Sequence, residues 1–121
     1  MDIHGHSNRI YCVKFADSGL IASGGWDSVV YLWDVRTKRS IKQIIGPHIY
    51  GEAIDIHGNV MVTGSHKAKF PIEIWDIGTE KCIESANWGD DPKDVCFLYT
   101  ARFSNDGCYI CLLYTSDAAD E

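Results

Sequence analysis

Val-Val-Tyr-Leu-Trp-Asp-Val at residues 29–35 returns as Ile-Glu-Ile-Trp-Asp-Ile at residues 72–77. The tryptophans of the two stretches are Trp33 and Trp75, so one full period separates them. Both stretches are short and rich in β-branched and aromatic side chains, which is typical of β-strands. A hydrophobic strand that returns after a period of roughly 40 residues indicates that the chain is built from repeated units of similar length.

Two further pairs of similar segments give nearly the same period. Ile-Ala-Ser-Gly-Gly at residues 21–25 returns as Met-Val-Thr-Gly-Ser at residues 61–65. Phe-Ala-Asp-Ser-Gly at residues 15–19 returns as Phe-Ser-Asn-Asp-Gly at residues 103–107, two periods further along the chain. The spacings, about 40 to 44 residues for each period, fit one four-stranded propeller blade, which takes about 40–45 residues. No segment shows a sustained helical stripe, so we expect an all-β chain.

Five elements of the first unit follow one another in the order of a WD40 repeat. They are Gly-His at 5–6, Val-Lys-Phe at 13–15, Ala-Ser-Gly-Gly at 22–25, Asp27 and Leu-Trp-Asp at 32–34. The second unit resembles a degenerate copy, and the third resembles the opening of another, so the resemblance covers residues 5–110. It implies four-stranded antiparallel blades of a WD40 β-propeller. The propeller is incomplete here, because closure takes about four to eight blades.

The resemblance also divides the chain. Repeat 1 takes residues 5–45, a degenerate repeat 2 takes residues 46–87, and repeat 3 begins at residues 88–110. Residues 111–121 resemble the translation of a transposase-type sequencing adapter read in frame, which implies a tail that is not native. Two and a half blades leave strand edges and apolar faces open. We therefore expect a longer natural protein, whose remaining blades are partners of this part.

Four polar or aromatic residues of the first unit, His6, Ser23, Asp27 and Trp33, stand where WD40 repeats carry a structural tetrad. Serine, histidine and aspartate could also form a catalytic triad, but the sequence lacks a Gly-x-Ser-x-Gly elbow. Buried polar groups are costly unless they are paired, so a closed network of these side chains would fix one blade geometry. We expect the structural role.

The second unit departs from this pattern. Thr63 and Trp75 occupy the hydroxyl and indole positions, but the hairpin between them, residues 66–71, is two residues longer and holds no acid. Gly-Pro-His replaces the Gly-His dipeptide, and whether His48 reaches Thr63 stays open. The longer basic hairpin is either a partner contact or a tolerated loop insertion.

Composition narrows the classes of function. The 121 residues include 11 basic and 17 acidic side chains, a formal net charge of −6, which argues against a nucleic-acid partner. Apolar runs reach five or six residues, against about 20 for a membrane-spanning helix. Five cysteines, mostly in apolar stretches, indicate reduced, buried thiols of an intracellular protein, cytoplasmic or nuclear. No cofactor or metal site is expected, because zinc-ligand spacing and phosphate-binding motifs are missing.

The resemblance implies a non-catalytic scaffold for protein-protein interactions, which holds proteins or peptides on the narrower propeller face. Carried over position by position, that face comprises Arg9, Tyr11, Trp26, Tyr50, Glu52, Phe97 and Tyr99. Tyrosine, tryptophan and arginine are enriched at binding hot spots. Packing between blades accounts for some of these positions, and Tyr11 and Trp26, which flank the central opening, are the best candidates for exposed contacts.

Two alternatives remain at this stage. A propeller enzyme would carry its site at the central channel and would need acids or histidines there, whereas the expected residues are mostly aromatic. A scaffold could also hold its partner at the rim, through the basic hairpin that contains Lys67 and Lys69.

Overall fold

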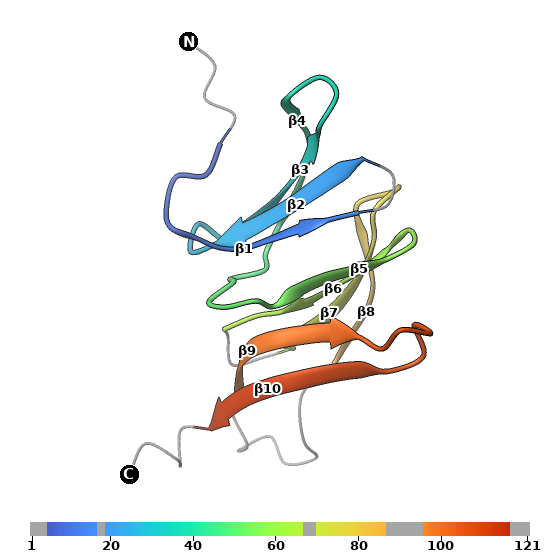
Figure 1. The fold of residues 1–121 in the computed structure, drawn as a ribbon. Coiled ribbons are helices and arrows are strands. Elements are labelled where there is room, and N and C mark those ends of the chain that lie inside the picture. The colour runs from blue at the N-terminus through green and yellow to red at the C-terminus, as the bar shows by residue number, and fades with distance from the viewer. Residues whose placement is uncertain (1–4, 17–18, 67–69, 87–95, 117–121) are drawn as a thin grey trace.

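The computed structural model describes residues 5–16, 19–66, 70–86 and 96–116, with the backbone alone for residues 96, 97 and 113–116. This part of the chain forms three antiparallel sheets, two of them four-stranded (Figure 1). The prediction of an all-β fold built from four-stranded antiparallel blades is confirmed. Among the described residues, no helix is long and apolar enough to span a membrane.

Each four-stranded sheet is a simple meander. The first contains β1 (Ile10–Phe15), β2 (Leu20–Gly25), β3 (Val29–Asp34) and β4 (Arg39–Ile45). The second contains β5 (Ile54–His57), β6 (Val60–Gly64), β7 (Ile72–Asp76) and β8 (Lys81–Ala86). A hairpin of β9 (Cys96–Phe103) and β10 (Ile110–Ser116) follows, so most of β10 lies in the stretch that resembles an adapter.

The aspartate of each Trp-Asp dipeptide closes the turn that follows its strand. The carboxylate of Asp34 accepts a hydrogen bond from the Arg36 N–H at 3.0 Å, and that of Asp76 accepts one from the Gly78 N–H at 3.0 Å. An aspartate that bonds the backbone two residues ahead stabilises a turn. The repeated dipeptide therefore has the same local structure in both sheets.

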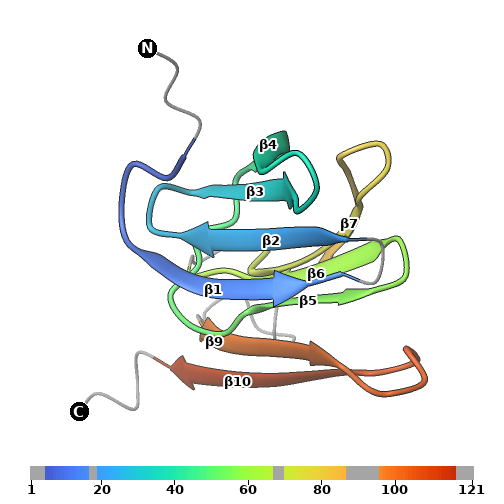
Figure 2. The same ribbon diagram turned by 45° about the horizontal axis from the view of Figure 1, so that its top comes forward.

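The sheets lie on one another in chain order, with the inner strands β1, β5 and β9 in succession (Figures 1 and 2). The core between the first two sheets is formed by Cys12, Ala22, Val30, Leu32, Ile44, Ile49, Ala53, Ile54, Met61, Trp75 and Ile77. Polar contacts reinforce the stacking, because the Lys42 ammonium donates to the carbonyls of Ile77 and Gly78 at 2.9 and 3.0 Å. The carboxylate of Asp55 accepts from the Phe103 N–H at 2.7 Å.

A glycine at the same repeat position lets each sheet approach the next. A Cβ on Gly24 would lie 2.7 Å from Ile54 Cδ1 and 2.8 Å from Ile49 Cγ1. A Cβ on Gly64, the equivalent glycine of the second sheet, would lie 3.1 Å from Leu98 Cβ and 3.3 Å from Ala101 Cβ. The missing side chain is thus part of the packing between sheets at both positions.

The four cysteines whose side chains are described are free but mostly exposed, so the prediction of buried thiols is wrong for Cys82, Cys108 and Cys111. Cys82 lies on β8, whose six side chains are all exposed, and the other two lie in the β9–β10 hairpin. Cys12 is buried between the first two sheets, where its thiol lies 3.8 Å from the Ile54 carbonyl. The side chain of Cys96 lies outside the described residues.

Gly24→Ala should lower the free energy of unfolding by about 1–3 kcal/mol, because the added methyl group overpacks the contact between the sheets. Gly78→Ala is the control, since the nearest atom there is 3.4 Å away, and it should change stability by less than about 0.5 kcal/mol. Urea unfolding of both variants compares them. Equal losses of stability in the two variants would contradict the close approach of the sheets at Gly24.

Cys12 should resist alkylation in the folded protein. Burial raises the pKa of the Cys12 thiol, so less of the reactive thiolate is present at a given pH, and the reagent also lacks access. Iodoacetamide followed by peptide mass spectrometry should show Cys82 and Cys108 modified first, and Cys12 only in denaturant. Fast modification of Cys12 without denaturant would mean that the first two sheets separate in solution.

Candidate functional site

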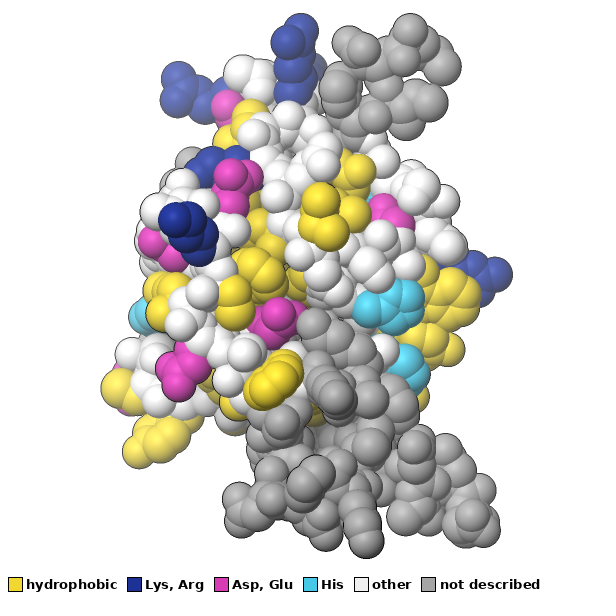
Figure 3. Space-filling view, turned by 180° about the vertical axis from the view of Figure 1, so that it is seen from behind, with side chains coloured by type: hydrophobic (Ala, Val, Ile, Leu, Met, Phe, Trp, Pro, Cys, Tyr) yellow, Lys and Arg dark blue, Asp and Glu magenta, His cyan; other side chains and the backbone are white. Residues whose placement is uncertain are grey.

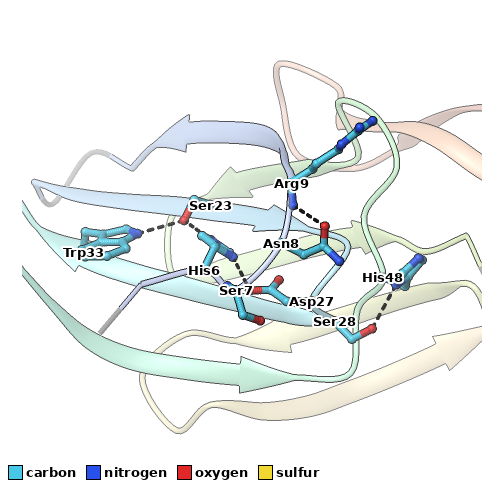
Figure 4. Close-up of polar contacts among 9 residues, drawn as sticks. All are labelled: His6, Ser7, Asn8, Arg9, Ser23, Asp27, Ser28, Trp33 and His48. Carbon is cyan, nitrogen blue, oxygen red and sulfur yellow. Dashed lines mark hydrogen bonds and ion pairs between the residues drawn. The ribbon is translucent and has the colours of Figure 1, made fainter. Parts of the chain in front are cut away.

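Four side chains of the first blade form a continuous chain of hydrogen bonds (Figure 4). The Trp33 indole N–H donates to Ser23 Oγ at 2.8 Å, and Ser23 Oγ lies 2.7 Å from His6 Nε2. His6 Nδ1 lies 2.8 Å from Asp27 Oδ2, which also accepts the Ser7 N–H at 3.1 Å. Because a carboxylate can only accept, His6 Nδ1 donates to Asp27, which leaves Nε2 to bond the hydroxyl of Ser23.

This order of serine, histidine and aspartate matches a catalytic triad, but the serine is not available for chemistry. Ser23 is 4% exposed, and its oxygen already accepts the indole N–H of Trp33. A nucleophile must reach a substrate carbonyl next to an oxyanion hole. The geometry therefore suits a structural network. The described residues also include no group of three or more His, Cys, Asp or Glu side chains that could hold a metal ion.

The second sheet keeps a smaller version of the network. The Trp75 indole N–H donates to Thr63 Oγ1 at 3.0 Å, and both side chains are buried. His48 turns to the first sheet, where its Nδ1 lies 3.0 Å from Ser28 Oγ. The open question of His48 is thus answered, because its ring links the two sheets and is not bonded to Thr63.

Six side chains are in contact at the end of the stacked sheets where the turn between β2 and β3 lies. Five aromatic rings, Tyr11, Trp26, Tyr50, His66 and Tyr99, form what we name the aromatic cluster. Tyr50 is its centre, with ring centroids 5.2 Å from Tyr11, 5.4 Å from Trp26, 4.7 Å from His66 and 5.6 Å from Tyr99. The sixth residue, Arg9, places its guanidinium 5.4 Å from the Trp26 ring centroid.

The cluster draws side chains from all three sheets and stays partly open to solvent. Its five rings are half-buried, and Arg9 is exposed. In Figure 3, hydrophobic side chains gather beside histidines at one edge of the molecule, with a basic side chain next to them. Aromatic pairs at such distances contribute about 0.5–1.5 kcal/mol each beyond their buried area, so the surface is both aromatic and rigid.

Of the seven residues expected at a partner-binding face, the structure brings five together: Arg9, Tyr11, Trp26, Tyr50 and Tyr99. Glu52 is exposed, and the Phe97 side chain lies outside the described residues, as do Lys67 and Lys69. Sequence analysis missed His66, which stacks on Tyr50. The repeat could have found it, because His66 occupies the hairpin position of the second unit that Trp26 occupies in the first.

Equivalent tryptophans have different surroundings in the two sheets. Trp75 is 8% exposed and packs against the first sheet. Trp33 lines an open groove of about 520 Å³ with Ile10, Val13, Ile21, Ser23, Val35 and Lys38. Val13 is 56% exposed and Phe15 on the same strand is 77% exposed. Among the described residues, nothing gives Trp33 the cover that the first sheet gives Trp75.

Four-stranded meanders that repeat along the chain and stack through their inner strands are blades of a β-propeller. Residues 1–34 match the family model described as WD domain, G-beta repeat. This match and a relative named as a WD repeat-containing protein support a WD40-repeat family.

Three curated relatives illustrate the range of the family. The chain is 33% identical to cilia- and flagella-associated protein 251 of Tetrahymena thermophila over 118 residues, 86% of this chain and 12% of that protein. It is 24% identical to the small ribosomal subunit protein RACK1 of Neurospora crassa, over 93% of this chain and 34% of the relative. It is 28% identical to human WD repeat-containing protein 18, over 74% and 20%. The chain thus spans about a third or less of these relatives.

Ser23→Ala should lower the free energy of unfolding by about 2–5 kcal/mol. It removes the shared partner of His6 and Trp33, and each buried group left without a partner costs about 1–3 kcal/mol. Thr63→Val should cost less, because it leaves only the Trp75 indole unpaired. Urea unfolding measured by tryptophan fluorescence gives both values.

A structural role for Ser23 also predicts that its hydroxyl is unreactive, which provides a control. A fluorophosphonate probe should leave Ser23 unmodified in the folded protein, because the hydroxyl is buried and engaged. Covalent labelling at Ser23, lost on His6→Ala, would mean that the triad geometry is catalytic. A larger stability loss for Thr63→Val than for Ser23→Ala would contradict the network described.

Proposed function

We propose that the chain is part of a non-catalytic scaffold that holds a partner protein on the aromatic cluster and Arg9. The supporting observation is the convergence of five rings and one guanidinium, contributed by three successive sheets, on one half-open surface. Tyrosine and tryptophan supply large contact area with few rotatable bonds, and together with arginine they dominate hot spots of protein interfaces.

The stacked arrangement favours binding because it is already ordered. Tyr11 and Tyr50 are nearly parallel, at 12°, and Tyr99 packs edge-on against Tyr50 at 74°. Rings held by their neighbours lose little further side-chain freedom when a partner arrives, which reduces one of the main costs of association. Relatives with names as different as a ciliary protein and a ribosomal-subunit protein fit a common platform with different partners.

A propeller enzyme is less well supported. The rings of the cluster contact one another, and the Ser23–His6–Asp27 network is buried and internally bonded. We also propose that another blade of a longer protein covers the groove beside Trp33, because the repeat-equivalent Trp75 is covered in that way. Free thiols at Cys12, Cys82, Cys108 and Cys111 support a reducing compartment, the cytoplasm or the nucleus.

Trp26→Ala and Tyr11→Ala should each weaken binding of a partner purified with the full-length native protein by about 2 kcal/mol or more, roughly 30-fold. Tyr109→Ala is the matched control, because Tyr109 is 72% exposed and lies in the β9–β10 hairpin, and it should leave affinity unchanged. Isothermal titration calorimetry measures the affinities, and circular dichroism checks that each variant folds.

The result distinguishes two surfaces. Folded Trp26→Ala and Tyr11→Ala variants that bind as tightly as the unmodified protein would overturn the proposal. Loss of affinity on replacing Lys67 and Lys69 instead would move the partner to the basic hairpin at the rim.

A further inference from the structure

Arg9 narrows the chemistry that the aromatic cluster can recognise. We infer that the cluster binds an acidic segment of the partner protein, with an aspartate or glutamate carboxylate on Arg9 and a neighbouring apolar side chain on Tyr50 and Tyr99. This inference rests on the proposed function, and it adds the chemical class of the partner segment.

The backbone and the side chain of Arg9 are both held in place. Its N–H donates to Asn8 Oδ1 at 2.8 Å, and its carbonyl accepts the Trp26 N–H at 3.0 Å. A Cβ on Gly25 would overlap that carbonyl, so the glycine allows the close approach. The guanidinium then lies over the Trp26 ring, where a cation is attracted to the aromatic face. A positively charged group is therefore presented at a fixed position.

The charge of Arg9 has no acidic partner in the part of the chain that the structure describes. The side chain is exposed, and among the described residues no carboxylate lies within ion-pair distance of it. A guanidinium offers five N–H donors in a planar fork that matches the two oxygens of a carboxylate. A fixed arginine without an acidic partner among the described residues is suited to an acidic ligand, because it supplies a local positive charge.

Trp26 adds a second unsatisfied group to the same place. Its indole N–H is buried and has no hydrogen-bond partner among the described residues. Buried donors are normally paired, because an unpaired one loses its hydrogen bonds to water without replacement. This unpaired donor lies on the ring against which the Arg9 guanidinium packs, so an oxygen acceptor of the ligand would satisfy it once the surrounding side chains make room.

Glu52 limits where the acidic group can bind. It is exposed and follows the central ring, Tyr50, by two residues, just before β5. Its negative charge repels an acidic ligand, whereas Arg9 attracts one, so the carboxylate of the ligand is expected to bind at Arg9. Removing the charge of Glu52 should therefore strengthen binding, the opposite of the effect of removing Arg9.

The test selects peptides from a phage-displayed library of short random sequences on the full chain, at low salt. The selected peptides should carry Asp or Glu beside an aromatic or aliphatic residue. Arg9→Gln should weaken their binding at least about tenfold, Arg9→Lys should weaken it less, and Glu52→Gln should strengthen it. Affinity should also fall as sodium chloride is raised. Fluorescence polarisation with the synthetic peptides gives each affinity, and Arg9→Lys serves if Arg9→Gln does not fold.

The outcomes separate this inference from the proposed function. Peptides that lose affinity on Trp26→Ala but carry no acid, or bind Arg9→Gln equally well, would overturn the acidic specificity and leave the scaffold surface intact. Peptides insensitive to both Trp26→Ala and Tyr11→Ala would overturn both. A requirement for phosphoserine, with no binding of the Asp or Glu version, would also overturn the assignment to a carboxylate.

Discussion

The hydrogen bond from a tryptophan indole to a hydroxyl on the adjacent strand is the interaction on which both blades depend. It joins Trp33 to Ser23 at 2.8 Å and Trp75 to Thr63 at 3.0 Å. An indole N–H that is bonded within its own sheet needs no further partner. The rings can therefore pack against the preceding blade without leaving a buried donor unpaired. Trp75 does so in the core between the first two sheets, and Trp33 has its N–H satisfied in the same way while its face stays open.

The rest of the network in the first blade determines where the candidate binding residues lie. Asp27 bonds both the ring of His6 and the N–H of Ser7, so the segment that enters β1 is tied to the β2–β3 hairpin. Arg9 follows that anchor by two residues, and Trp26 directly precedes Asp27 in the hairpin. The buried polar network and the exposed face are therefore linked, and a loss of the first would displace the second.

Much of this arrangement could be predicted from the sequence, because equivalent residues of successive repeats occupy equivalent places in the sheets. The Trp-Asp stretches located β3 and β7, and the repeat period aligned Tyr50 and Tyr99 with the first unit. Burial of the outer strand was not predictable. The equivalent outer strand β4 buries Ile44, but all six side chains of β8 are exposed, so the Cys82 thiol faces solvent. The bond between His48 and Ser28 joins two different repeats, whereas the repeat pattern suggested a bond from His48 to Thr63 within its own repeat, so periodicity gave no indication of it.

Because the aromatic cluster crosses the boundaries between blades, packing and recognition use the same rings. Tyr50 contacts four other rings, from three sheets, so its removal would change the stacking of the blades as well as the surface. Arg9 and Trp26 both precede β3 in the first unit, and Arg9 contacts the cluster through the Trp26 ring. The geometry gives the two residues different roles. Tyr50, at the centre, supports the packing of the blades, and the exposed Arg9 guanidinium, at the edge, is placed to contact a ligand. The rings that pack between blades keep this surface rigid, and the residues at its edge can differ from one protein to another. This suits a family whose members share a fold and differ in the proteins they hold.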